Sequence, residues 1–312
     1  MNGVDDRFLT RNGLAARRLA VLLMGHEPQA RLPRVKDFAE ELGCGNGTVQ
    51  AALRLLEESG AIETAARGHL GTFLIASDRA ILWRLSGLGT LRCALPLPHS
   101  RRFEGIASGL RAAFEAAGTP FSPTYMRGAG ARCAALLEGG VDLVVLSRLA
   151  ADRLIERHKG RLSLVADLGP ATYVGAYGCL LHEGAALDTP GLRVAVDHAS
   201  LDQRLLAERA FAGRDDIRWV ESSSMGVREL LAQRRADATV WSLDEAQHLP
   251  GVEVLPLGEE VTRDLEPRAS SAALIGRTEG AEALSAARGV LDPGRVTRVQ
   301  AEVVRGERVP SY

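Results

Sequence analysis

Cysteine and long apolar runs are both scarce in this chain of 312 residues. The four cysteines (Cys44, Cys93, Cys133 and Cys179) include no CxxC pair, which argues against a zinc cluster or a disulfide framework and predicts reduced, mostly buried thiols. No run of about 18 apolar residues occurs, so no membrane-spanning segment is expected. The N-terminal MNGVDDRFLTRNG lacks the basic end and apolar core of a signal peptide, so we expect a cytoplasmic protein.

Catalytic motifs are missing as well. The sequence contains no GxSxG, HExxH or P-loop pattern, and its histidines are dispersed. Pyridoxal phosphate needs a Schiff-base lysine, but Lys36 falls in the N-terminal module and Lys159 in a loop after a helix. We therefore predict no cofactor, no metal site and no catalytic residue. An acid–base pair such as His99 with Glu104 keeps one alternative open, an enzyme acting on a small carboxylate or phosphorylated metabolite.

The composition is that of a globular protein with two or three domains: 46% of the residues are hydrophobic and 25% are charged. The net charge of −1 does not by itself indicate a nucleic-acid partner. The first 75 residues hold nine basic and nine acidic side chains. A DNA-binding function therefore depends on where the charges lie and not on their sum.

Residues 1–76 show the pattern of a winged helix-turn-helix domain. Asn46 is expected to cap the third helix, and Gly43-Cys44-Gly45 forms the turn before it. A hairpin tip is expected at Arg67–Leu70, between two short strands. Apolar spacing and turn residues predict helices at 14–24, 35–42 and 47–59 and strands at 61–64 and 71–75.

The segments LPRVKDFAEELGCGNGTVQAALRLLEESGAIE and RGHLGTF resemble the winged helix of GntR-type regulators. Asn46 and Gln50 replace arginines that are usual in the broader family, which implies weaker and less salt-dependent binding. Both side chains can still read adenine edges in the major groove. The alternative is a winged helix that serves only protein contacts. With Arg67 of the wing added, the resemblance implies that the residues approaching double-stranded DNA are Lys36, Asn46, Thr48, Gln50, Arg67 and His69.

Residues 77–90 form the expected linker, and residues 91–312 the expected effector-binding domain. The apolar residues Ile81, Leu82 and Trp83 indicate a linker that packs as a strand or helix, with a second subunit as one candidate partner. Beyond it, apolar runs alternate with helical patterns, which predicts an α/β domain with mostly parallel strands. The runs lie at 91–97, 121–126, 141–146, 162–168, 173–181, 192–196, 217–220, 238–241 and 252–257.

A helix–turn–strand pattern occurs twice in this domain. In each copy an acid precedes a buried strand that ends in a serine five residues later, Asp142 to Ser147 and Asp237 to Ser242. Ligands of open α/β sheets bind beyond the carboxyl ends of the strands. We therefore predict a two-lobed domain with a cleft, lobe 1 spanning about 91–185 plus 270–312 and lobe 2 about 190–258.

Polar residues follow the predicted strand ends and suit a small anion. Ser100 is a good N-cap for the helix that follows it, and Arg127 could clamp an anion with two hydrogen bonds. For a single serine, helix capping without a ligand is the alternative. The predicted ligand-binding residues are His99, Ser100, Arg101, Arg127, Ser147 and Arg148 in the first lobe and His198, Ser200, Ser222, Ser223, Ser224 and Ser242 in the second.

The stretches PLPHSRRFEGIASGL, YMRGAGARC, VDLVVLSRLAADRLI and VPSY resemble the YhfZ family. In that family a GntR-like winged helix precedes a domain similar to type 2 periplasmic binding proteins. The resemblance implies a transcriptional regulator with a DNA operator and a small effector. His99 and Phe103 stand where tyrosines are expected, which leaves the effector undefined. A homodimer is expected because one winged helix contacts few base pairs. The attached winged helix disfavours the other alternative, a transport-binding protein.

Overall fold

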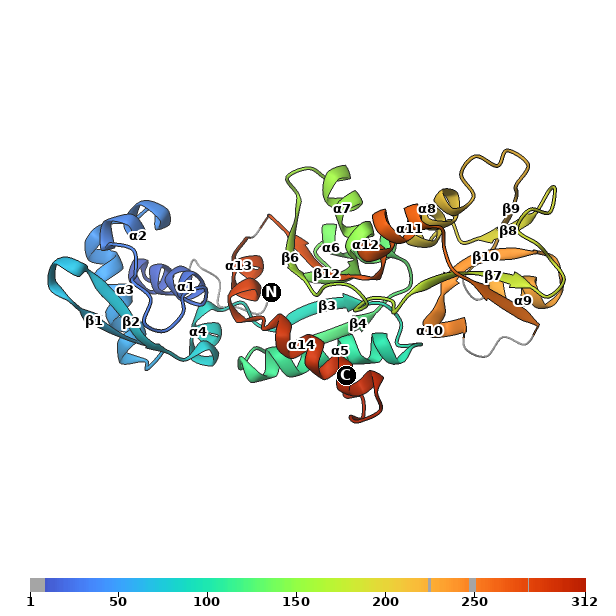
Figure 1. The fold of residues 1–312 in the computed structure, drawn as a ribbon. Coiled ribbons are helices and arrows are strands. Elements are labelled where there is room, and N and C mark those ends of the chain that lie inside the picture. The colour runs from blue at the N-terminus through green and yellow to red at the C-terminus, as the bar shows by residue number, and fades with distance from the viewer. Residues whose placement is uncertain (1–8, 224–225, 247–250, 280) are drawn as a thin grey trace.

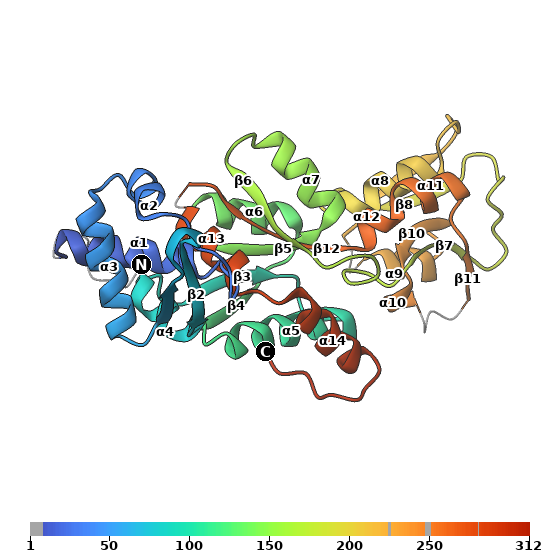
Figure 2. The same cartoon turned by 60° about the vertical axis from the view of Figure 1, so that its left-hand side comes forward.

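The computed structural model describes residues 9–223, 226–246, 251–279 and 281–312. The chain forms an elongated molecule with a small N-terminal domain at one end and two sheet-containing lobes beyond it (Figures 1 and 2). Within the described residues, no helix has both the length and the apolar character needed to cross a membrane.

The N-terminal domain is a winged helix-turn-helix. Its helices bury Leu19, Phe38, Val49 and Leu56 in one core, and the wing adds Leu74. Its elements are α1 (Arg11–Leu23), α2 (Val35–Leu42), α3 (Asn46–Glu58), β1 (Ile62–Ala66), the short 3-10 helix η2 (Gly68–Leu70) and β2 (Thr72–Ser77). The expected hairpin tip is therefore confirmed as a turn around η2.

The turn between α2 and α3 corrects the predicted N-cap of α3. Gly43 ends α2 in the left-handed conformation (φ +64°), which glycine adopts without strain. Asn46 is the first residue of α3, and Gly45 occupies the N-cap position without a side-chain hydrogen bond. The expectation that Asn46 caps the helix was wrong because the chain enters the helix one residue earlier. The amide of Asn46 is therefore not engaged as a cap.

The expected linker is a helix, α4 (Arg79–Ser86), capped by Asp78. Leu82 and Trp83 are buried inside the chain, and the indole of Trp83 donates to Gly89 O at 2.8 Å. Arg17 Nε of α1 donates to Ser86 O at 2.9 Å. The proposed use of Leu82 and Trp83 in a subunit contact was therefore wrong, since both side chains already pack within this chain.

Lobe 1 is built on a five-stranded sheet with the strand order β4-β3-β5-β12-β6. Helices α5 and α14 cover one face, and α6 and α7 lie on the other (Figure 1). Gly109 lets α5 approach α14, since a Cβ there would lie 2.5 Å from Val296 O. The elements are β3 (Leu91–Leu95), α5 (Arg101–Ala116), β4 (Phe121–Tyr125), α6 (Ala129–Leu137), β5 (Leu143–Ser147), α7 (Arg148–Arg157), β6 (Leu162–Asp167), β12 (Ala272–Arg277), α13 (Ala281–Val290) and α14 (Pro293–Val304).

Lobe 2 is built on a second five-stranded sheet with the order β11-β7-β10-β8-β9. Its core contains Tyr177, Val194, Leu206 and Val240. The elements are β7 (Tyr177–His182), β8 (Arg193–Val196), α8 (Leu201–Ala210), β9 (Arg218–Glu221), α9 (Val227–Ala232), β10 (Ala238–Ser242), α10 (Leu243–Ala246), β11 (Val252–Leu255), α11 (Glu259–Asp264) and α12 (Glu266–Ser270).

The chain passes between the lobes twice, first between β6 and β7 and again between α12 and β12. These two crossings correct the predicted assignment of strands to lobes. The strand 177–182 was assigned to lobe 1 but pairs with β10 and β11 of lobe 2. The strand 272–277 was not predicted and pairs with β5 and β6 of lobe 1. Each is the first strand after a crossing and runs antiparallel to both of its neighbours. As a result, four of the eight strand pairings described within the two sheets are antiparallel, so the sheets are mixed and not mostly parallel.

The aspartate of the repeated helix–turn–strand pattern has the same type of partner, an arginine, in both lobes. Asp142 accepts hydrogen bonds from the backbone N and the guanidinium of Arg92, the shortest at 2.7 Å. Asp237 does the same with Arg193, the shortest contact being 2.5 Å. Each pair ties the start of one strand to its parallel neighbour, so the repeat seen in the sequence is a structural repeat. Ser147 and Ser242 lie at the opposite, carboxyl ends of the same strands.

The N-terminal domain packs directly on lobe 1. One continuous apolar core runs from α1 through α4 to α13 and α14. At Gly289 of α13 a Cβ would lie 2.6 Å from Met24 O, and at Gly118 it would lie 2.1 Å from Ala80 Cβ. Arg18 and Glu282 add an ion pair at 3.8 Å. A groove of about 850 Å³ remains beside this contact, lined in part by Asp78.

Candidate ligand site and DNA-binding surface

The carboxyl ends of β3, β4 and β5 share one edge of the lobe 1 sheet, because these strands are parallel. The carboxyl ends of β8, β9 and β10 share an edge of the lobe 2 sheet for the same reason. Side chains that follow these two edges contact one another across the lobe junction, as described below. The predicted cleft location is thus where the lobes meet, and in this structure the lobes are in contact there.

Ser147 lies at the centre of this junction. Its side chain is fully buried and caps α7 by accepting from Ala150 N at 3.0 Å. Its hydroxyl donates to Asp202 Oδ1 of α8 in lobe 2 at 2.7 Å. Burial raises the pKa of Asp202 to about 6, although the hydrogen bond from Ser147 and the charge of Arg132 act in the opposite direction.

Arg132 is a site residue that the sequence analysis missed. It is 2% exposed, and its guanidinium donates to Val145 O (3.0 Å), Met126 O (2.7 Å) and the Tyr173 hydroxyl (3.0 Å). A buried arginine needs such partners to offset the loss of hydration. The signal in the sequence was a single charged residue within the apolar helix AGARCAALL.

Two ion pairs flank this buried group. Arg127, which follows β4, lies 3.5 Å from Asp197, which follows β8. Arg102 of α5 contacts Asp244 of α10 at 3.0 Å, and Asp244 also accepts from Gly175 N at 2.8 Å. Arg127 was predicted to contact an anion and here meets the protein's own carboxylate. Asp197, Asp202 and Asp244 were not predicted as site residues.

The remaining predicted residues of lobe 1 have local roles. Ser100 caps α5 as expected, accepting from Phe103 N at 3.3 Å. The ring of His99 packs edge-on against Phe103 at a centroid distance of 5.2 Å. Arg101 is exposed and pairs with Glu104 at 3.5 Å. All of these contacts lie within lobe 1, and none of them joins lobe 1 to lobe 2.

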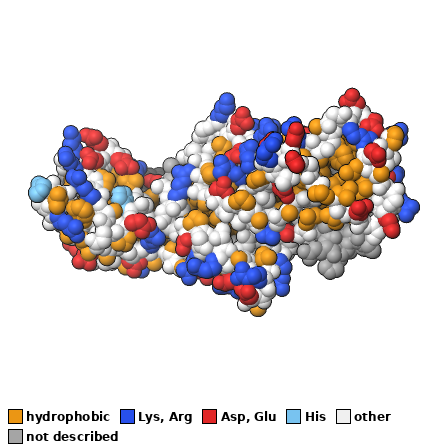
Figure 3. Space-filling view, viewed as in Figure 1, with side chains coloured by type: hydrophobic (Ala, Val, Ile, Leu, Met, Phe, Trp, Pro, Cys, Tyr) orange, Lys and Arg blue, Asp and Glu red, His pale blue; other side chains and the backbone are white. Residues whose placement is uncertain are grey.

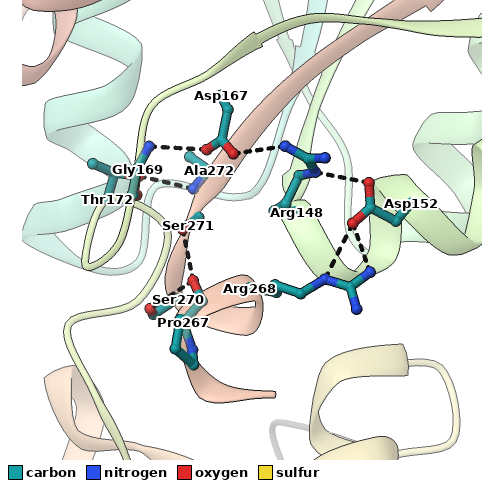
Figure 4. Close-up of polar contacts among 10 residues, drawn as sticks. All are labelled: Arg148, Asp152, Asp167, Gly169, Thr172, Pro267, Arg268, Ser270, Ser271 and Ala272. Atoms are coloured by element: carbon teal, nitrogen blue, oxygen red, sulfur yellow. Dashed lines mark hydrogen bonds and ion pairs between the residues drawn. The ribbon is translucent and has the colours of Figure 1, made fainter. Parts of the chain in front are cut away.

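Arg148 is the first residue of α7 and contacts two carboxylates of lobe 1 (Figure 4). Its guanidinium contacts Asp152 and Asp167, each at 2.7 Å. Asp152 also binds Arg268 of α12 at 2.6 Å, next to the second crossing. Thr172 of the first crossing accepts from Ala272 N at 2.8 Å. Arg148 therefore ties together the segments that connect the lobes.

The predicted residues of lobe 2 are mostly near the surface. Ser200 caps α8 by accepting from Gln203 N, and His198 is 3.5 Å from Glu221. Ser222 donates to the carbonyl of Ser223 at 2.9 Å. Ser242 is buried at the carboxyl end of β10, as expected. Ser223 is exposed, and Ser224 lies outside the described residues.

The residues predicted to contact DNA lie on α2, α3 and the wing. Asn46, Gln50 and His69 are exposed, whereas Thr48 is half-buried. Arg67 stacks over the ring of Phe73, with 4.5 Å from guanidinium carbon to ring centroid. Lys36 is exposed and lies 3.7 Å from Glu40. On the face of this domain seen in Figure 3, basic and histidine side chains lie interspersed with acidic ones. Of the six predicted contact residues, Lys36 thus lies on α2, three lie on α3 (Asn46, Thr48 and Gln50), and Arg67 and His69 lie on the wing.

Comparisons with known proteins fit this architecture. The family described as "YhfZ C-terminal domain" matches residues 78–312, and a helix-turn-helix family matches residues 29–74. The chain is 34% identical to YhfZ of Escherichia coli (strain K12) over 307 residues, 98% of this chain and 99% of the relative. This chain belongs to the YhfZ family. The crystal structure of YhfZ from Shigella flexneri matches with a TM-score of 0.64 at 32% identity, covering 75% of this chain and 98% of that one.

The fold of the YhfZ domain is also that of periplasmic binding proteins. The aliphatic sulphonate binding protein SsuA from Escherichia coli matches with a TM-score of 0.53 at 19% identity, covering 70% of this chain and 75% of that chain. The helix-turn-helix domain indicates a DNA-binding regulator, and the second domain has a ligand-binding fold. Within the described residues, no group of three or more His, Cys, Asp or Glu side chains is placed to hold a metal ion.

Proposed function

We propose that this protein is a ligand-responsive transcriptional regulator without enzymatic activity. Its winged helix binds an operator, and a small molecule with an anionic group binds between the two lobes. The observation that supports this best is the position of Arg102, Arg127 and Arg132 on the lobe 1 side of the junction, joined to a DNA-binding domain through one core. Because it acts on DNA, we place it in the cytoplasm.

For DNA recognition, α3 enters the major groove. Gln50 and Asn46 are exposed amides that can pair with an adenine edge, and Thr48 lies beside them. Lys36 supplies a phosphate contact from the start of α2, and the wing brings Arg67 and His69 to the backbone or minor groove. A single domain of this size reads few base pairs, so we propose a homodimer on two half-sites.

The ligand is proposed to bind in the cleft because side chains of lobe 1 already contact carboxylates there. Ser147, the N-cap of α7, holds a carboxylate, that of Asp202, in this structure. Arg127 holds a second one, that of Asp197. A ligand with an anionic group can take the place of either carboxylate when the lobes separate and close again.

The shared core determines how ligand binding reaches DNA. The winged helix and lobe 1 move as one body because Gly289 and Gly118 bring their backbones into direct contact. Lobe closure therefore moves lobe 2 relative to this body. In a dimer, that motion changes the spacing of the two winged helices when lobe 2 takes part in the subunit contact. A useful response requires about 1–3 kcal/mol of coupling between the two sites.

The test is operator selection by the full-length protein from fragmented genomic DNA, followed by fluorescence anisotropy on the selected fragments. We expect tight, salt-dependent binding to a few fragments and weak binding to random DNA. The same titration on Gln50→Ala should lose the preference. Equal affinity for selected and random DNA in the wild type would contradict the regulatory function.

A further inference from the structure

Around Ser147, the charges that meet across the lobe junction are sorted by lobe, with cations on the lobe 1 side and carboxylates on the lobe 2 side. Arg102 and Arg127 pair with Asp244 and Asp197, and the charge of Arg132 acts on Asp202. Next to the second crossing the polarity is reversed, because Asp152 of lobe 1 pairs with Arg268 of α12. The two sets balance in number. A ligand that binds between them meets a positive surface on one side and a negative surface on the other.

A purely anionic ligand fits only half of this arrangement. To contact Arg127 it must displace Asp197, and to contact Ser147 it must displace Asp202. Both aspartates are less than 10% exposed with the lobes together. Closing the lobes on an anion would bury these carboxylates beside a like charge, which is unfavourable.

Asp197 is held in place by contacts within lobe 2. Gln203 accepts from Asp197 N at 2.9 Å and donates to Thr239 Oγ1 at 3.1 Å, and Thr239 in turn donates to Ala195 O. Ala199 N donates to Asp197 Oδ1 at 2.9 Å. These contacts do not involve lobe 1, so the carboxylate of Asp197 keeps its position when the lobes separate and is available to a ligand in the open state.

We infer that the effector is a zwitterion, with an anionic group for the arginines of lobe 1 and an ammonium group for the aspartates of lobe 2. An amino acid or an aminoalkyl phosphate or phosphonate has this chemistry. Such a ligand exchanges the ion pair between Arg127 and Asp197 for two ligand ion pairs, one with each residue. The inference rests on the proposed ligand-binding function of the cleft and defines its ligand class.

The environment of Asp202 agrees with this assignment. Burial raises the pKa of its carboxyl group to about 6, so the charged form is penalised when the lobes are together without a ligand. An ammonium group beside Asp202 removes this penalty. The hydroxyl of Ser147, released from Asp202, then donates to the anionic group of the ligand.

The test compares matched compounds on the full-length protein, by thermal shift and then calorimetry. Each amino acid is paired with its deaminated acid, aminoethylphosphonate with ethylphosphonate, and phosphoethanolamine with ethyl phosphate. We expect stabilisation by one or more aminated compounds and none by the deaminated partners. Asp202→Asn and Asp197→Asn should each weaken the aminated ligand on the order of 30-fold or more. The exposed control Asp215→Asn should leave its affinity unchanged.

The outcomes separate this inference from the proposed function. Equal or tighter binding of the deaminated compounds, with no loss in Asp202→Asn or Asp197→Asn, overturns the zwitterion and leaves an anion-binding regulator. Binding of neither series overturns both the ligand class and the cleft as effector site, while operator binding is measured separately. The two aspartate variants are tested in parallel, with circular dichroism to verify folding, so that misfolding of one does not decide the result.

Discussion

The hydroxyl of Ser147 in lobe 1 donates a 2.7 Å hydrogen bond to the carboxylate of Asp202 in lobe 2. Ser147 also caps α7, so the carboxylate lies at a helix N-terminus, where an anion is favoured. The protein thus places its own carboxylate in the position expected for the anionic group of a ligand. Several of the expected effects of substitution depend on this contact.

Substitution of Asp202 should change how stability depends on pH. The folded pKa of about 6 lies above the ordinary value of 3.8, so the folded state binds this proton more tightly than the unfolded state. The unfolding free energy therefore falls as pH rises from about 4 to about 6, by roughly 2–3 kcal/mol. In Asp202→Asn this contribution is absent. Urea unfolding of both proteins near pH 4 and near pH 7 tests this, and parallel pH profiles would contradict it.

Ser147→Ala should destabilise the protein by about 1–3 kcal/mol, because it removes a helix cap and leaves the buried carboxylate of Asp202 without its donor. The matched control is Ser100→Ala, which removes a cap on α5 without an interlobe hydrogen bond. Ser100→Ala should lower the free energy of unfolding by less, about 1 kcal/mol. Chemical denaturation of both variants gives the comparison, and equal losses would mean that the contact with Asp202 contributes nothing.

The aspartate of each structural repeat should be required for the stability of its lobe. Asp237→Ala leaves the backbone N and guanidinium of Arg193 without their acceptor and should cost about 1–3 kcal/mol. Asp142→Ala should have a similar effect in lobe 1 through Arg92. Thermal denaturation reports the loss. The exposed Asp215→Ala serves as control, and a comparable effect there would show that the paired geometry is not the cause.

The contact between the winged helix and lobe 1 should be sensitive to Gly289. A side chain there meets the backbone of Met24, which cannot move as a flexible side chain can. Gly289→Val should destabilise the contact by about 1–3 kcal/mol and increase proteolysis between residues 77 and 90. Gly130→Ala, where a Cβ has open space, is the control. Unchanged proteolysis in Gly289→Val would argue that the two parts are not one rigid body.

The DNA-contacting residues should separate into two classes. Gln50→Ala should cost about 1–3 kcal/mol on the preferred operator and relax the sequence preference at one position. Lys36→Ala should weaken all sequences alike and reduce the salt dependence. Anisotropy titrations at several salt concentrations distinguish the classes. Arg204→Ala on α8 of lobe 2 is the control, and an equal loss there would argue against recognition through α3.

The sequence by itself determined the elements of the winged helix and most of the sheet strands, in their order. Apolar spacing located the three helices of the winged helix, because a 3.6-residue period reflects local geometry and one buried face. It also located nine of the sheet strands and the repeated units ending in Ser147 and Ser242. The winged helix followed by a two-lobed binding domain, and the membership of the YhfZ family, could be inferred from these patterns and motifs.

The tertiary structure decided which elements are neighbours and which polar side chains meet. The strand 177–182 follows lobe 1 in the chain but pairs in lobe 2, because pairing depends on where the crossing leads and not on sequence distance. Arg132 and Asp202 are 70 residues apart and show no shared motif. They come close only when the two lobes fold and pack, and burial is what raises the pKa of Asp202. The sequence shows the sign of each residue's charge, but which charges pair depends on how the two lobes pack. The arrangement of charges at the site could therefore not be predicted from the sequence.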